Sequence, residues 1–150
     1  MLEKLDLTKK LEKEEYKKKM EVLEARLGEL QRTCRAMGLP VMIVFEGYDA
    51  AGKGVQIGKL IRALDPRGFE VHVVKAETEE ERLHPFLWRF WTKLPGKGRI
   101  AIYDGSWYRK VLQDRFEGRT KKGDIPKAFQ SIRSFEEQLT EDGMVMIKIF

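Results

Sequence analysis

Four short apolar runs alternate with amphipathic segments along most of the chain. The runs are VMIVF at 41–45, FEVHVV at 69–74, RIAIYD at 99–104 and MVMIKIF at 144–150. The first of them, VMIVF, is continuously apolar and rich in β-branched residues, which is typical of a buried parallel strand. Because helical patterns separate these runs, we predict an α/β fold, a three-layer sandwich whose parallel sheet carries helices on both faces.

A long helix is predicted before the first strand. From Thr8 to Met37, apolar residues recur at alternating steps of four and three, which places them on one stripe of a helix. The stripe contains Tyr16, Met20, Leu23, Leu27, Leu30, Cys34 and Met37. It can cover the protein's own sheet or pair with another chain as a coiled coil, and we favour the first because the heptad run is short. We expect a helical segment at 1–38, a core at 39–150 and a homo-oligomer, most simply a dimer.

Further helices are predicted between the strands. Residues 78–81, Thr-Glu-Glu-Glu, match a capping box at a helix start. One helix is expected from about Trp107 to Phe116. Another opens at Asp124 and Pro126. The apolar face of that helix is expected to contain Phe129, Ile132, Phe135 and Leu139.

The segment GYDAAGKG at 47–54 lies between the first strand and the helical pattern that follows it. Its glycines and lysine match the phosphate-loop pattern G-x-x-x-x-G-K-[S/T] in the required context. We expect backbone N–H groups and the helix N-terminus to bind a phosphate, and Lys53 to supply a positive charge to it. The alternative is a glycine-rich turn that only lets strand and helix pack. The predicted phosphate-binding residues of this loop are Gly47, Ala50, Ala51, Gly52, Lys53 and Gly54.

Gly54 occupies the position where the pattern has a hydroxyl that binds magnesium. Asp49, within the loop, can replace it because Mg²⁺ prefers carboxylate, phosphate and water oxygens, although Asp49 can alternatively cap the next helix. Asp104 ends the third strand, where an acid in phosphate-loop enzymes orients magnesium or the attacking group. Ser106 can cap the following helix, which leaves Asp104 free. We therefore predict Asp49, Lys53 and Asp104 as catalytic residues and a Mg²⁺ held by Asp49 and Asp104.

The charge distribution favours an anionic ligand. The chain has a net charge of +5, and residues 85–133 carry twelve lysines and arginines against four carboxylates. Such a surface can bind a long polyanion, but nothing matches a nucleic-acid recognition motif, so no nucleic-acid partner is expected. The single cysteine, Cys34, excludes an internal disulfide, and no apolar run approaches the length of a membrane span. We expect a cytoplasmic protein with no membrane partner.

Three sequence blocks together resemble the polyphosphate kinase type 2 family, over about residues 15–150. They are GYDAAGKG, FLWRFWTKLPGKGRIAIYDGSWYRKVL and FEEQLTEDGMVMIK, and within the family they are most similar to the polyphosphate:AMP phosphotransferase branch. The resemblance implies a thymidylate-kinase-like core with a helical lid. It also implies magnesium-dependent phosphoryl transfer between polyphosphate and a nucleotide such as AMP or ADP. By position, the family's loop acid and lysine fall on Asp49 and Lys53, and the acid of its second motif falls on Asp104.

Two features depart from the family's pattern. The family usually has arginine after the second acid, in D-R-S-W-Y, where this chain has Gly105. Arg109 or Lys110 can compensate, and we include Arg109 among the phosphate-binding residues. The lid would lie beyond Phe150, so we expect a fragment whose core is incomplete and whose site is open to water. Two alternatives to the transferase remain, a non-catalytic polyphosphate- or nucleotide-binding domain and an ATP-dependent nucleoside monophosphate kinase.

Overall fold

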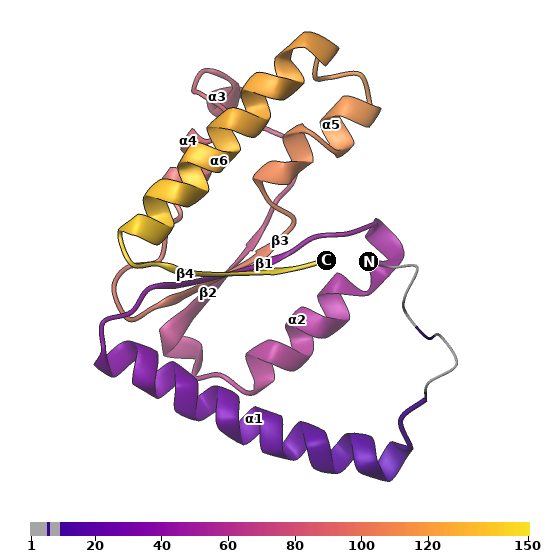
Figure 1. Cartoon of the computed structure of the whole chain (residues 1–150), viewed down its shortest axis with the longest axis vertical. Helices are drawn as coiled ribbons and strands as arrows, with labels where there is room; N and C mark the ends of the chain where they lie inside the picture. Colours follow the sequence, from indigo (N-terminus) through magenta and orange to yellow (C-terminus); the bar gives the residue numbers. More distant parts are fainter. Residues whose placement is uncertain (1–5, 7–9) are drawn as a thin grey trace.

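The computed structural model describes residue 6 and residues 10–150, except for the side chain of Asp49. Four strands form one sheet in the order β2-β3-β1-β4, and all neighbouring strands are parallel (Figure 1). The sequence prediction of a parallel α/β sheet is therefore confirmed. The strands are β1 Val41–Phe45, β2 Phe69–Val73, β3 Ile100–Asp104 and β4 Val145–Ile149.

Helices lie on both faces of this sheet (Figure 1). On one side are α1 and α2, and on the other are α4 and α6 with the short helices α3 and α5 near them. The α-helices are α1 Lys13–Ala36, α2 Lys53–Arg62, α3 Glu79–Arg82, α4 Trp88–Trp91, α5 Gln113–Phe116 and α6 Ile125–Glu141. The 3₁₀ helices are η2 Asp49–Ala51, η3 Pro66–Gly68, η4 Trp107–Lys110 and η5 Lys122–Asp124. Among the described residues, none of these helices has the length and apolar character needed to cross a membrane.

Alternation along the two central strands divides the core into two clusters. Met42 and Val44 of β1 pack in one cluster with Phe135 of α6, whereas Ile43 packs in the other with Ile57 of α2. All five residues of β1 are buried, which is the pattern of a strand covered on both faces. The strand that precedes the glycine loop is therefore fixed from both sides.

Helix α1 is shorter than predicted, and only part of its apolar stripe is covered. Thr8 lies outside the described residues, whereas residues 10–12 are described and are not helical. Leu27 and Cys34 pack against the α2-side cluster, as expected. Four other members of the stripe are between 38% and 71% exposed, so the prediction that the stripe covers the sheet is wrong for Tyr16, Leu23, Leu30 and Met37. In Figure 1, α2 lies between the sheet and much of α1, so α1 does not lie directly on the sheet there.

Two helix predictions in the second half need correction. Residues 107–116 form η4 and then α5, with Leu112 in a non-helical conformation between them. The buried residues of this segment have helical spacing, and that spacing shows which side of the segment faces the core. It does not show which carbonyl accepts each N–H, so it cannot distinguish one continuous α-helix from two short helices. In α6, Phe129 is exposed, and the position facing the core is Ala128. The capping box at Thr78 and Glu81 is confirmed, with both hydrogen bonds present.

Candidate active site

The glycine loop connects the carboxyl end of β1 to the N-terminus of α2. Gly52, which immediately precedes α2, has φ +83°, a left-handed conformation that glycine adopts at little cost. A Cβ atom added at Gly52 or Gly54 would meet nothing within 4 Å, so the space beside the loop is open. The first N–H groups of α2 have no intrahelical acceptor and can bind an anion. The N–H of Ala51 is different, because it already donates to the carbonyl of Tyr48 at 2.9 Å.

Lys53 is the first residue of α2, and its side chain folds back over the loop. Its Nζ donates to the carbonyl oxygens of Gly47 and Tyr48 at 2.8 and 2.9 Å. The ammonium group is therefore held at the start of the loop and makes no ion pair with any described residue. A bound phosphate can replace one of these carbonyl acceptors. The geometry suits a lysine that binds an anion within the loop.

Asp104 lies beside the start of the loop because of strand pairing. Its Cα is the register partner of Phe45, and the next amide, of Gly105, donates to the carbonyl of Phe45 at 2.9 Å. The carboxylate of Asp104 makes no hydrogen bond or ion pair within the part of the chain that the structure describes. Ser106 caps η4 by accepting the N–H of Tyr108, so the expected capping role of Ser106 is confirmed. Asp104 remains available for a ligand.

The side chain of Asp49 lies outside the described residues, so its predicted role stays a prediction. Its backbone begins the short helix η2 inside the loop. Among the described residues there is no group of three or more metal-ligating side chains. Magnesium commonly uses only one or two carboxylates together with substrate phosphates and water. The free carboxylate of Asp104 beside the open glycine loop therefore fits a magnesium ion that is held partly by its ligand.

Glu46 is a site residue that the sequence analysis missed. It lies between β1 and Gly47, and its carboxylate accepts a hydrogen bond from the Ser106 hydroxyl. Burial raises the pKa of Glu46 above its usual value, and the hydrogen bond from Ser106 and the charge of Lys53 oppose this rise. The sequence signal that could have identified Glu46 is its position, since it is an acid directly before the glycine loop. Its partner lies 60 residues away, so the contact itself had no local signal.

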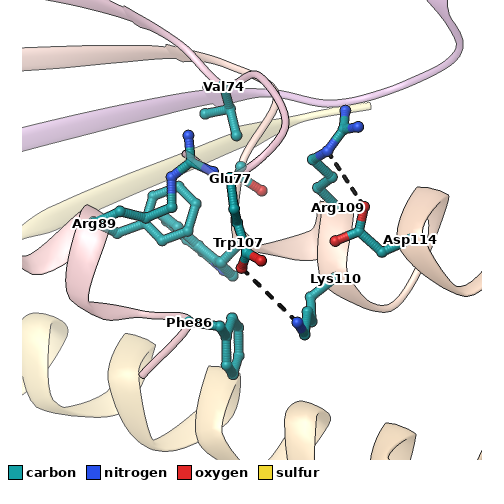
Figure 2. Close-up of a pocket in the computed structure, with 10 residues that line it drawn as sticks. Val74, Glu77, Phe86, Arg89, Trp107, Arg109, Lys110 and Asp114 are labelled. Carbon is teal, nitrogen blue, oxygen red and sulfur yellow. Dashed lines mark ion pairs between the residues drawn. The ribbon is translucent and has the colours of Figure 1, made fainter. Parts of the chain in front are cut away.

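The cations expected to compensate for Gly105 already have partners (Figure 2). Arg109 Nε lies 3.5 Å from Asp114 Oδ1, and its guanidinium also donates to Gln113. Lys110 Nζ lies 3.8 Å from a carboxylate oxygen of Glu77. Both residues line a cavity of about 10 Å³ beside Trp107, which is room for roughly one water molecule. A phosphate would have to compete with these carboxylates for Arg109.

Comparison with protein families identifies the group to which the site belongs. Residues 10–150 match the family described as polyphosphate kinase 2. The chain belongs to the polyphosphate kinase 2 family. The resemblance inferred from its motifs is thereby confirmed, and the match includes the loop, Asp104 and all four strands.

Curated relatives of this polyphosphate kinase 2 chain include two polyphosphate:AMP phosphotransferases. The protein from Pseudomonas syringae is 43% identical over 150 residues, which is 100% of this chain and 30% of the relative. The protein from Pseudomonas aeruginosa has the same identity and coverage. An NDP-polyphosphate phosphotransferase from Ruegeria pomeroyi is 33% identical over 91% of this chain and 45% of its own length. The chain therefore spans less than half the length of each of these relatives.

Two crystal structures of polyphosphate kinase 2 proteins share the fold. One, from Pseudomonas aeruginosa, has a TM-score of 0.92 and 44% identity, and covers 98% of this chain and 32% of that one. The other, from Arthrobacter aurescens, has a TM-score of 0.88 and 31% identity, and covers 100% of this chain and 58% of that one. The sheet and both helical layers are thus those of solved family members.

Proposed function

We propose that this chain is the phosphate-binding core of a polyphosphate-dependent nucleotide phosphotransferase, which moves a phosphoryl group from polyphosphate to a nucleotide such as AMP. The observation that carries the proposal is the open glycine loop with Lys53 folded over it, next to the unpaired carboxylate of Asp104. Phosphoryl transfer depends mainly on positioning and charge stabilisation, which are the contributions these groups can make. The names of the relatives supply the substrate class.

In this proposal, each residue has a defined task. The N–H groups of the first turn of α2 and the ammonium of Lys53 bind the phosphates, while Arg109 is a further phosphate ligand once Asp114 releases it. Mg²⁺, held by Asp49 and Asp104, neutralises negative charge on the phosphates when it is bound. We propose a boundary between a helical segment at 1–38 and a core at 39–150, which is supported by the short connection between the end of α1 at Ala36 and the start of β1 at Val41. The composition supports a cytoplasmic location, and the exposed stripe of α1 supports a dimer.

A non-catalytic polyphosphate- or nucleotide-binding domain is the second candidate. Gly105 removes the arginine that the family usually has, and the guanidinium of Arg109 is engaged by Asp114 and Gln113. A site with fewer free cations can still hold an anion through its loop amides and Lys53. Binding without turnover is the result that would distinguish this candidate.

The test is ADP formation from AMP and Mg²⁺ in two separate reactions, one with long-chain polyphosphate and no ATP and the other with ATP and no polyphosphate. It is run on the 150-residue chain and on a chimera in which this chain replaces the matched 150 residues of the Pseudomonas syringae relative. Lys53→Ala is expected to lower turnover by about 10²-fold or more, because a positioned charge on the transferring group is lost. Lys127→Ala is the matched control, since Lys127 is exposed on α6, and it is expected to retain activity.

Each outcome separates the candidates. The transferase is supported if the wild-type protein turns over polyphosphate and AMP, Lys53→Ala abolishes this turnover and Lys127→Ala leaves it unchanged. No turnover in the chain or the chimera, with polyphosphate still bound, rejects the transferase and supports the binding domain. Turnover with ATP but not with polyphosphate rejects polyphosphate as the donor and supports the nucleoside monophosphate kinase.

A further inference from the structure

Glu46 and Ser106 form a direct contact between the two parts of the candidate site. Glu46 immediately precedes the glycine loop, and Ser106 follows Asp104 by two residues. Ser106 is fully buried, and its hydroxyl donates to the Glu46 carboxylate. The backbone amides of Gly47 and Ser106 lower the pKa of this carboxylate against the larger effect of burial, which raises it. One hydrogen bond thus joins the residue before the loop to the segment after β3.

The direction of the Ser106 hydroxyl is fixed by its second partner. Its Oγ accepts the N–H of Tyr108 at 3.2 Å, so its only proton is directed to Glu46. The Ser106 side chain therefore cannot rotate away without losing both the cap of η4 and the bond to Glu46. This arrangement gives the contact a single geometry.

The contact continues the pairing of β1 and β3 beyond the end of the ladder. The last bond of that ladder is from the N–H of Gly105 to the carbonyl of Phe45, at 2.9 Å. After this bond, the segment that follows β1 turns towards α2, and the segment that follows β3 turns into η4. Glu46 and Ser106 are 60 residues apart in sequence, and their contact holds the two segments together at the point where they diverge. The position of Asp104 relative to the loop therefore depends on the contact between Glu46 and Ser106.

We propose that Glu46 is a positioning residue of the phosphotransfer reaction, and that it fixes Asp104 relative to the phosphate loop through its bond to Ser106. This inference rests on the proposed function. Glu46 does not act as a ligand of phosphate, because its carboxylate is an anion like the phosphate and already accepts the Ser106 hydroxyl. It acts through the geometry of the groups that do bind the ligand.

An anionic carboxylate suits this position better than the amide of the same shape. The Ser106 hydroxyl donates to the Glu46 carboxylate, and the charge that acts on the carboxylate is the cation of Lys53. Glutamine keeps one acceptor oxygen but removes the negative charge and replaces the second oxygen with a donor NH₂ group. Glu46→Gln therefore tests the contact with almost no change in volume.

The experiment is a double-mutant cycle on the 150-residue chain with Glu46→Gln, Ser106→Ala and the double variant. Steady-state rates are measured with AMP, polyphosphate and Mg²⁺, and amide hydrogen exchange is followed at residues 47–54. Each single variant is expected to lower kcat by roughly 10- to 100-fold with little change in the KM for AMP, because misplacement of catalytic groups affects the chemical step. The double variant is expected to be no slower than the worse single variant. Glu137→Gln and Ser131→Ala, at exposed positions of α6, are the controls.

The possible results separate this inference from the proposed function. Additive effects in the double variant, or a raised KM with unchanged kcat, would overturn the positioning role. If the wild-type chain shows no turnover, the proposed function fails for the isolated chain. The contact between Glu46 and Ser106 is then tested by amide hydrogen exchange, which does not require turnover. Exchange in 47–54 that is about tenfold faster in Glu46→Gln but not in Glu137→Gln supports the contact, and unchanged exchange overturns it.

Discussion

Gly105 separates Asp104 from Ser106 and has a backbone conformation that few other residues adopt. Its φ is +76°, and a Cβ atom added there would lie 3.5 Å from Val74 Cβ, an ordinary contact distance. The restriction at this position is therefore conformational and not steric. The arginine that the family usually has here would have to adopt the same left-handed conformation or shift the turn between β3 and η4. An arginine at this position would therefore change both the charge of the site and the conformation of the backbone after Asp104.

Gly105→Ala is expected to lower the free energy of unfolding by about 1–2 kcal/mol, the cost of a left-handed conformation for a residue with a Cβ. Gly58→Ala is the matched control, because Gly58 lies inside α2 without positive φ and with nothing within 4 Å of an added Cβ. There alanine is expected to stabilise the protein by up to about 1 kcal/mol through helix propensity. Urea unfolding measures both. Equal effects of the same sign would contradict the conformational argument.

At the scale of elements, Glu136 joins α6, η4 and β4. Its carboxylate accepts the Trp107 indole N–H at 3.0 Å and the Tyr108 hydroxyl at 2.8 Å, and it pairs with Lys148 Nζ at 2.8 Å. Burial, together with the Glu136 hydrogen bond, raises the pKa of Tyr108 above its ordinary value, which already keeps this hydroxyl a donor at neutral pH. Since η4 follows the Asp104 motif, Glu136 holds one side of the candidate site.

Glu136→Ala is expected to destabilise the fold by about 1–3 kcal/mol, because the buried Trp107 N–H loses its acceptor. Glu136→Gln should cost less, since an acceptor oxygen remains. Urea unfolding followed by tryptophan fluorescence measures both changes. Glu137→Ala, one position along on the exposed side of α6, should stay within about 0.5 kcal/mol of wild type. The assignment would be wrong if the two alanine variants were equally stable.

The elements that sequence could predict are those with a strong local signal. VMIVF at 41–45 was recognised as a buried strand because its burial on both faces removes polar positions from the run. The break at Leu112 could not be predicted, because one continuous helix and two short helices would show the same spacing of apolar residues. The exposure of Phe129 was also hidden, since the choice between Ala128 and Phe129 depends on where α6 lies on the sheet.

At the scale of the molecule, α1 is attached to the rest of the chain by apolar packing and by polar contacts, of which the Lys59–Tyr16 bond is exposed and the Gln31–Asp65 bonds are partly buried. Gln31 is the only buried residue of α1, and its side-chain amide bonds the backbone of Asp65 in both directions, at 3.0 and 2.7 Å. Gly68 leaves room for it, because an added Cβ there would lie 2.5 Å from Gln31 Nε2. Gln31 thus fixes how the long helix lies against the loop after α2.

Gln31→Ala is expected to lower the free energy of unfolding by about 1–3 kcal/mol and to speed amide exchange in α1, because the backbone N–H and carbonyl of Asp65 lose their partner. Gly68→Ala should have a similar effect by displacing Gln31, and the two together should cost less than their sum. Gln138→Ala, on the exposed side of α6, is the control. Strict additivity of Gln31→Ala and Gly68→Ala would show that they do not act on the same contact.

The candidate site could be predicted from sequence only in part, and the reason lies in distance along the chain. The loop and Lys53 form one continuous segment, and Asp104 ends a recognisable strand, so local patterns were sufficient for them. The contacts of Glu46 with Ser106 and of Gln31 with Asp65 join residues 60 and 34 positions apart. No local pattern reports such pairs. The ion pair between Arg109 and Asp114 was missed for a different reason, because its residues are close in sequence but lie on the two sides of the break at Leu112.

The central place of β1 has a consequence for synthesis on the ribosome. β1 pairs with β3 on one side and with β4 on the other, and the β4 partners lie about 100 residues later in the chain. At roughly 5–20 residues per second, β4 emerges on the order of 5–20 s after β1. During that time VMIVF exposes an unpaired apolar edge, the kind of surface on which chains associate wrongly. The strand that precedes the glycine loop therefore depends on protection of its open edge until translation reaches β4.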